Sequence, residues 1–286
     1  MTVQQLTDRI KEKTGVNLPP DQTCDQLMTG DPGMEVKKIG CTFMATVDVI
    51  REAAAQGVNV IITHEPTWFT GADQTGWIEQ DAVYQEKRRL LEENRIAVWR
   101  FHDHMHIGHT DEIYTGFDRE FGWGKYHVEI TNAEKYGETD PAKAEFWKHF
   151  GAVYELPETT LQELCGFFKE RAGMDVVQIV GRPDMPVRRV SVLVGGGSLG
   201  LGREEAPMIQ MDREQIDVVI CGDITEWTLS AYVRDAAALG KNKGMLVLGH
   251  ERSEEWGMKY LPDWLAPIAD GIPAVFLDAG EPFTYL

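Results

Sequence analysis

The sequence predicts an α/β protein built from two related α/β halves with mostly parallel sheets. Short apolar runs of strand length alternate with helical stretches over residues 36–101, and the same alternation returns over residues 187–278. The two halves also begin alike, with EVKKIGCTF (35–43) and PVRRVSVLV (186–194). Apolar strands separated by helices are typical of βαβ units, whose parallel strands are covered on both faces of the sheet.

The first half begins with an amphipathic helix over residues 2–14, which Gly15 ends. Residues 17–33 are dense in Pro, Gly and Asp, which predicts a loop. The elements predicted next are strand 36–46, helix 46–57, strand 58–63, helix 76–95 and strand 96–101.

The second half repeats this order. Its predicted elements are strand 187–197, a helix near 203–214, strand 217–222, helix 225–240 with Thr225 as its N-cap, strand 244–249, a helix from about 253 and strand 273–278. The stretch between the halves is less regular and ends in a predicted helix (159–172) and strand (175–181). We therefore divide the chain into a first α/β half (1–121), a connector that could form an oligomer contact (122–186), and a second half that completes a metal site (187–286).

The charge of the chain excludes several kinds of partner. The sequence has 28 Lys and Arg against 46 Asp and Glu, a formal net charge of −18. Binding to nucleic acid or to an anionic membrane surface needs a basic surface, so neither is expected. An excess of carboxylates suits cations instead.

The location is predicted from cysteine usage and hydropathy. None of the four cysteines lies in a CxxC pair, and a chain of this length needs no disulfide scaffold. The N-terminal segment is polar, so no signal peptide is expected, and no apolar run approaches the roughly 18 residues of a transmembrane helix. These features predict a cytoplasmic protein.

Residues that can bind metal follow four of the predicted strands. They are His64 and Glu65, the run from His102 to His109, Asp223 and Glu226, and the run from His250 to Glu254. Six of the eight histidines fall in these positions. Ligands bind beyond the carboxyl ends of parallel strands, so the residues are expected near a common site.

The spacing of these residues refines the expectation. On extended backbone, His104 and His106 would share one side, and on a helix His250 and Glu254 would share one face. A mixed set of imidazoles and carboxylates suits two divalent ions, about 3.5–4 Å apart, that activate a water. Asp103, His104 and Glu226 are then candidates to carry protons.

Several of these patterns also have structural interpretations. Asp223 could cap the next helix, and Glu251 and Glu255 are expected to face solvent. The glycine-rich stretch 195–202 is compatible with an anion-binding loop, although it lacks the Lys-Ser/Thr of a P-loop. Trp68, Phe69 and Trp77 are expected to pack in the core, with a pocket wall as the alternative.

The motifs together resemble a known family. VNVIITHEPTWF resembles the adlIitHHPlff segment of the Ngg-interacting-factor-three-like (NIF-three-like) proteins, which are also called GTP cyclohydrolase I type 2 homologues. LVLGHERSE resembles the family's GHyxtE signature. IAVWRFHDHMH, CDQLMTGDP and DVVICGDITEW resemble three further segments in the family's order.

The resemblance implies a NIF-three-like fold and a cytoplasmic homohexamer, a trimer of dimers, that binds two divalent metal ions per chain (Zn, Fe or Mn). The implied metal ligands are His64, Glu65, His106, His250 and Glu254. Glu65 stands where the family has a second His, and His106 stands where it has an Asp, so the balance of ligand types is kept. His102 would contact one of these ligands without binding the metal itself.

The leading interpretation is a metal-dependent hydrolase with a dinuclear centre and an unknown small-molecule substrate, either a cyclic amidine, as in a cyclohydrolase, or a phosphoester. The alternative is a non-catalytic metal-binding ring that stores or delivers metal or serves as an interaction scaffold. An amidohydrolase barrel is less favoured, because it needs eight strand–helix units and the sequence supplies six or seven strands.

Overall fold

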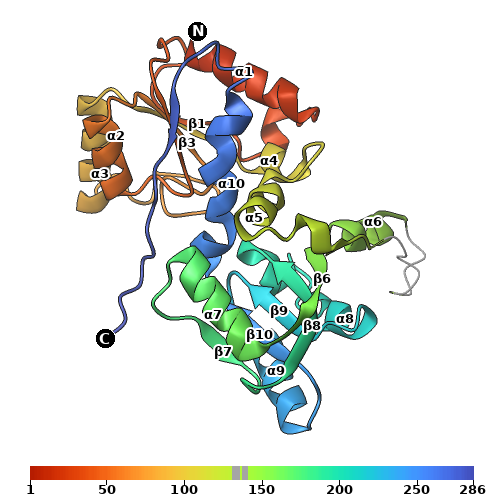
Figure 1. Ribbon diagram of the computed structural model, residues 1–286. Coiled ribbons are helices and arrows are strands. Elements are labelled where there is room, and N and C mark those ends of the chain that lie inside the picture. Colours follow the sequence, from red (N-terminus) through yellow and green to blue (C-terminus); the bar gives the residue numbers. More distant parts are fainter. Residues whose placement is uncertain (131–135, 137–140) are drawn as a thin grey trace. The chain divides into compact units, whose positions relative to one another are not determined.

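The computed structural model describes residues 1–130, 136 and 141–286, which form two compact units (Figure 1). Unit 1 comprises Met1–Gly116 and Glu255–Gly280, and unit 2 comprises Phe117–Glu254 and Glu281–Leu286. Each unit has its own sheet with helices packed against it. The α/β prediction is therefore confirmed. The sequence-based division kept 187–286 together, whereas in the structure the chain returns to unit 1 after Glu254.

The sheet of unit 1 has the strand order β1-β4-β3-β2-β11. Its strands are β1 (Leu27–Thr29), β2 (Ile39–Thr42), β3 (Val60–Thr63), β4 (Ala97–Arg100) and β11 (Ala274–Phe276). All neighbouring strands run parallel except β1, which pairs antiparallel with β4. Every residue of β2, β3 and β4 is buried, as expected for the middle of a covered parallel sheet.

Three helices of unit 1 follow the predicted order: α1 (Val3–Thr14), α2 (Val47–Ala55) and α3 (Ala82–Glu93). The short η1 (Pro20–Gln22), α4 (Asp103–Ile107) and α5 (Glu112–Phe121) were not predicted. Helices α5 and α10 (His250–Leu265) continue across the boundary between the units. Residues of α2 and α3, among them Ile50 and Leu91, pack with Ile61 and Val98 of the sheet in one core. On α1, Lys13 donates a hydrogen bond to the carbonyl oxygen of Trp264 in the part of α10 that belongs to unit 1.

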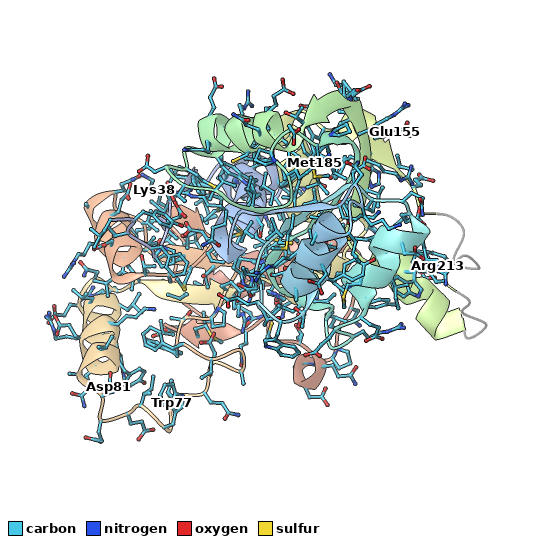
Figure 2. The ribbon with its side chains drawn as sticks, turned by 90° about the horizontal axis from the view of Figure 1, so that it is seen from below. Lys38, Trp77, Asp81, Glu155, Met185 and Arg213 are labelled. Atoms are coloured by element: carbon cyan, nitrogen blue, oxygen red, sulfur yellow. The ribbon has the colours of Figure 1, made fainter. Side chains whose placement is uncertain are left out.

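Two elements of unit 1 and the burial of two aromatic side chains differ from the prediction. The expected loop 17–33 contains β1, which forms because its backbone pairs with β4, where Leu27 lies opposite Trp99. The helix expected from 76 begins only at Ala82, because the carboxylate of Asp81 accepts hydrogen bonds from the backbone N–H groups of the first turn. Two aromatic side chains expected in the core, Trp77 (labelled in Figure 2) and Phe69, are 63% and 53% exposed.

The sheet of unit 2 has the order β5-β6-β8-β9-β10-β7. Its strands are β5 (His127–Val128), β6 (Ala152–Thr160), β7 (Gln178–Val180), β8 (Pro186–Leu193), β9 (Val218–Cys221) and β10 (Gly244–Val247). The central strands β8, β9 and β10 are parallel, and the outer strands are antiparallel. The predicted connector 122–186 thus supplies outer strands on both edges of this sheet, because the central strands alone would leave open edges.

Helices cover both faces of the second sheet. The helical elements of unit 2 are η2 (Gly124–Tyr126), α6 (Pro141–His149), α7 (Leu161–Ala172), η4 (Gly195–Leu199), α8 (Ala206–Arg213) and α9 (Leu229–Ala238). Val153 of β6 packs with Trp147, Met211 and Val233 in one core. The next residue, Tyr154, faces the other way and contacts an aromatic group that includes Phe117 and Trp123.

Two predictions at helix starts are wrong. Helix α9 begins at Leu229, with Thr228 rather than Thr225 at the N-cap position. Glu251 and Glu255 are 6% and 1% exposed, because α10 is buried around much of its circumference rather than only on one face. In the described part of the chain, no helix is long and apolar enough to span a membrane.

Candidate metal-binding groups in the two units

His64 follows β3 directly and is completely buried. Its Nδ1 lies 3.1 Å from the carbonyl oxygen of Phe101, the residue after β4. A carbonyl oxygen can only accept, so Nδ1 carries the proton and donates it. This hydrogen bond makes Nε2 the metal-binding nitrogen and fixes the plane of the ring, as backbone carbonyls commonly do for metal-binding histidines.

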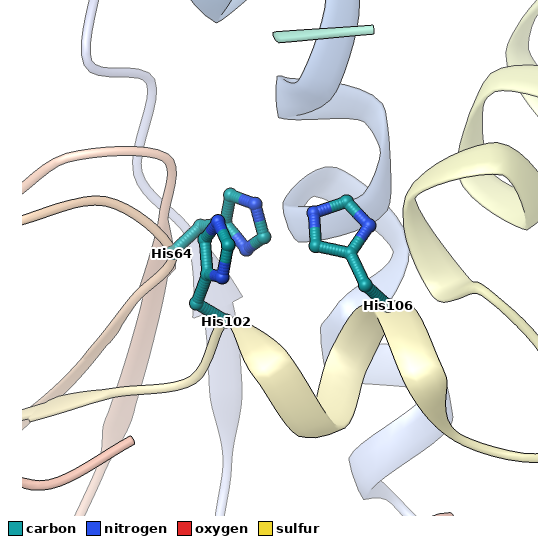
Figure 3. A group of neighbouring side chains, drawn as sticks. All are labelled: His64, His102 and His106. Carbon is teal, nitrogen blue, oxygen red and sulfur yellow. The ribbon is translucent and has the colours of Figure 1, made fainter. Parts of the chain in front are cut away.

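Three histidines of unit 1 gather in one place, and we call them the three-histidine group (His64, His102, His106). The ring of His64 stacks on that of His102 with 4.6 Å between centroids, and His106 meets the two edge-on at 5.0 and 4.9 Å (Figure 3). One ligand atom from each of the three rings lies within 4.8 Å of the others. Three imidazoles at this separation are a donor set that suits Zn, Fe, Co or Ni.

Carboxylates hold the other two rings of this group. His102 Nδ1 lies 3.0 Å from Oδ1 of Asp103, and His106 Nδ1 lies 2.9 Å from Oδ2 of Asp111. The same Asp111 accepts the backbone N–H groups of Ile113 and Tyr114 through its other oxygen, so it also caps helix α5. All three rings therefore have Nδ1 engaged, which orients them and raises the basicity of Nε2.

The backbone under this group is helical, so the prediction of an extended run from His102 to His106 is wrong. Residues Asp103–Ile107 form α4, and a single buried carboxylate makes this short helix possible. Asp25 accepts the backbone N–H groups of His102, Asp103 and His104 at 2.7, 2.9 and 2.9 Å. It thereby satisfies the N–H groups that a helix start leaves without partners.

The helix separates His104 from His106, which were expected on one side. His104 is 2% exposed, and its Nδ1 lies 2.7 Å from Oδ2 of Asp25. Asp103 is also engaged, because its carboxylate accepts from the Cys24 backbone N–H at 2.8 Å and pairs with His102. The hydrogen bond with His102 holds the pKa of the Asp103 carboxyl well below its usual range. Both residues thus position the helix and the rings around them.

Glu65 is held by a buried arginine. Arg100, which is 4% exposed, approaches the Glu65 carboxylate at 3.5 Å and donates to the carbonyl oxygens of His64 and Gly71. The other carboxylate oxygen of Glu65 lies 3.8 Å from Nε2 of His102. Glu65 therefore faces the three-histidine group with part of its charge offset by Arg100.

Unit 2 contains a different arrangement, which we call the His250 group (Asp223, His250, Glu254). Helix α10 begins at His250, before the expected start near 253, so His250 and Glu254 share one helical face. Nε2 of His250 lies 3.1 Å from Oε2 of Glu254. Nδ1 lies 2.8 Å from Oδ2 of Asp223, which follows β9. Asp223 therefore orients the imidazole rather than capping α9. Glu226, the remaining candidate proton carrier, is exposed in the turn that precedes α9.

The glycine-rich stretch 195–202 also serves the His250 group. A Cβ on Gly195 would lie 2.0 Å from Oε1 of Glu254 and 2.7 Å from Nε2 of His250, and the residue has a φ of +49°. Gly195 also accepts from the Asp223 N–H and donates to the hydroxyl of Ser253. Only glycine fits this close approach, which explains the first glycine of the stretch without any bound anion.

Sequence reasoning missed Asp25 and Asp111. Neither follows a predicted strand, and both act by accepting backbone N–H groups at helix starts. An Asp immediately before a helical pattern is a capping signal, which could have marked Asp111. Asp25 acts across 77 residues of sequence or more, so no local pattern identifies it.

Comparison with known proteins gives a consistent family. Residues 1–280 match the sequence profile of Duf34/NIF3 (NGG1p interacting factor 3). A GTP cyclohydrolase 1 type 2 homolog of Clostridium acetobutylicum is 27% identical over 238 residues, or 81% of this chain and 80% of the relative. A relative of the same name from Clostridium perfringens is 25% identical over 257 residues, or 89% and 87% of the two chains. The crystal structure of a Bacillus cereus protein related to NIF3 superimposes with a TM-score of 0.72 at 17% identity and covers 100% and 99% of the two chains, which shows a common fold.

Proposed function

We propose that this chain, which belongs to the Duf34/NIF3 family, binds divalent metal and acts as a metal-dependent hydrolase with a dinuclear centre. The three-histidine group supports the proposal most directly. Each of its rings has Nδ1 hydrogen-bonded to a carbonyl or carboxylate oxygen, so each is oriented to offer Nε2. Histidines that only filled the core would also need hydrogen bonds, but they would not need to bring one ligand atom each within 4.8 Å of the others.

In this proposal some residues bind the metal ions and others orient the metal-binding side chains. His64, His102 and His106 would bind through Nε2, with Glu65 beside them, and His250 and Glu254 would bind in unit 2. Asp103, Asp111 and Asp223 would fix the imidazole rings. Two divalent ions would lower the pKa of a shared water and so provide a nucleophile near neutral pH. A cyclic amidine and a phosphoester are both substrates for such a nucleophile, and two curated relatives bear the name GTP cyclohydrolase 1 type 2 homolog.

One observation favours the alternative, a non-catalytic metal-binding ring that stores or delivers metal. His104 and Asp103, two of the three expected proton carriers, are each engaged in hydrogen bonds that build helix α4. A protein that only holds metal would need no proton carrier. Assembly as a homohexamer stays a prediction, which native mass spectrometry would check.

Elemental analysis tests the proposal on protein purified without chelator or nickel resin. We expect about two divalent ions per chain in the wild type and in the control His149→Ala, whose side chain is 76% exposed. His106→Ala removes a ligand from unit 1, and His250→Ala removes one from unit 2. If either change releases both ions, the two groups share one centre; if each releases one ion, the sites are separate. Full metal content in both variants would contradict the proposal.

A hydrolysis assay distinguishes a metal-dependent hydrolase from a metal-storage protein. GTP and an aryl phosphoester serve as the two substrate classes, assayed with the same four proteins. An enzyme would show turnover that falls in proportion to metal content. Bound metal with no turnover on either substrate would favour the metal-storage function.

A further inference from the structure

A second set of ligand atoms lies beside the three-histidine group. The thiol of Cys24, the imidazole of His102 and the carboxylate of Asp103 place one ligand atom each within 4.8 Å of one another. Of these three residues, only His102 is also a member of the three-histidine group. Cys24 has no role in the proposed function. All three side chains are partly exposed, so an ion from solution can reach them.

One carboxylate organises this set. Asp103 accepts the backbone N–H of Cys24 at Oδ2, 2.8 Å away, and its Oδ1 lies 3.0 Å from His102 Nδ1. Two ligand atoms that each lie about 2.1 Å from the same ion are about 3 Å apart when they subtend a right angle. An ion bound to both atoms would therefore need little change in the distance between Nδ1 of His102 and Oδ1 of Asp103.

The donor atoms of Cys24, His102 and Asp103 differ from those of the three-histidine group. Sulfur, nitrogen and oxygen donors together suit a borderline ion such as Zn²⁺, and thiolate selects against Mg²⁺ and Ca²⁺. Glu65, which pairs with Arg100, lies on the Nε2 side of the His102 ring, and Asp103 lies on the Nδ1 side. The two nitrogens of this ring therefore point into two different ligand sets.

We propose that Cys24, Asp103 and His102 through Nδ1 form a thiolate-containing zinc site, joined through the His102 ring to the three-histidine group. Binding releases the Cys24 thiol proton and the His102 Nδ1 proton to solvent, and no other bond changes.

Titration of metal-free protein with Co²⁺ tests the proposal. A thiolate bound to Co²⁺ gives a charge-transfer absorption in the near ultraviolet, whereas imidazole and carboxylate ligands give only visible bands. We expect the charge-transfer band in the wild type and in Cys165→Ser, which changes a partly exposed cysteine of unit 2. Cys24→Ser should lose that band and keep the visible bands. A band absent from the wild type, or unchanged in Cys24→Ser, would overturn the proposal.

A second measurement does not depend on cobalt. Zn²⁺ should slow alkylation of Cys24 by iodoacetamide about ten-fold or more in the wild type and leave Cys165 unaffected, as read by peptide mass spectrometry. Asp103→Asn retains an oxygen that can accept the Cys24 N–H but removes a charged ligand, so protection by Zn²⁺ should be lost. Equal protection in Asp103→Asn would contradict the site.

A further variant separates this site from the proposed function. His106→Ala lies outside the thiolate set, so it should retain the charge-transfer band even if the three-histidine group binds nothing. Loss of the band in Cys24→Ser together with normal metal-dependent hydrolysis would support the thiolate site on its own.

Discussion

The three-histidine group of unit 1 and the His250 group of unit 2 place imidazole in two different settings. In unit 1, three rings each have one nitrogen engaged by a single oxygen acceptor, from Phe101, Asp103 or Asp111. In unit 2, one ring lies between two carboxylates, Asp223 and Glu254. The first group is rich in nitrogen and the second in oxygen, so the second is expected to accept harder ions more readily.

The two groups also depend on different parts of the sequence. The His250 group needs a helix that begins at His250, which is local to the pair, and a glycine at 195, which comes from the segment after β8. The three-histidine group needs α4, and α4 depends on Asp25 from a distant segment. Changes at Asp25 and at Gly195 should therefore affect one group each.

The largest expected effect comes from Asp25→Ala. The change leaves three backbone N–H groups and buried His104 without their acceptor, so unit 1 should lose about 3–5 kcal/mol of unfolding free energy. Metal binding that depends on His106 should be lost with it. Urea unfolding and metal analysis check the two parts, with Asp21→Ala as a control because Asp21 is exposed in the same segment. Metal content that survives in Asp25→Ala would show that α4 forms without its cap.

Gly195→Ala is the corresponding change in unit 2. The added Cβ would meet Glu254 and His250, and the φ of +49° disfavours any side chain, so a loss of about 2–3 kcal/mol is expected. Gly196→Ala is the matched control, because its Cβ would have no neighbour within 4 Å. Metal release limited to the ion that His250→Ala also releases would show that the two groups hold separate ions, against the proposed dinuclear centre, whereas release of both ions would support that centre. Equal behaviour of the two alanine variants would mean that the close approach at Gly195 is not required.

The sequence predicts the second group better than the first for a physical reason. The pair His250 and Glu254 depends on one helical turn, and the strand before it is short and apolar, so local pattern is enough. The α/β class follows from the same local signals. His102 was expected behind the ligands, yet its ring stacks on His64 within the group.

The errors in unit 1 arise from long-range contacts. Histidine has modest helix propensity, so the run from His102 to His106 gives little sign of α4, and only the capping by Asp25 makes it helical. Strand β1 is likewise set by the edge of β4 rather than by its own composition. No spacing rule within the run could have separated His104 from His106.

A smaller effect is expected in how the unfolding free energy of each unit depends on pH. Each contains a lysine that donates to backbone carbonyl oxygens: Lys87 to Thr67 in unit 1, and Lys243 to Met211 and Ile216 in unit 2. Burial lowers the pKa of both, and it lowers that of Lys87, which is 3% exposed, to about 8. The unfolded chain holds the Lys87 proton more tightly, with a pKa of 10.5, so the unfolding free energy should rise with pH across this interval.

Between about pH 7 and about pH 9 this rise should be about 1 kcal/mol, and Lys87→Met should abolish it. Urea unfolding of the wild type and the variant at both pH values measures the difference. Lys243→Met should change the pH dependence less, because Lys243 is only partly buried. A pH dependence that is the same in the wild type and in Lys87→Met would mean that Lys87 keeps an ordinary pKa. Thr67 would then accept from a charged ammonium throughout this range, and the loop after His64 would have the same stability at both pH values.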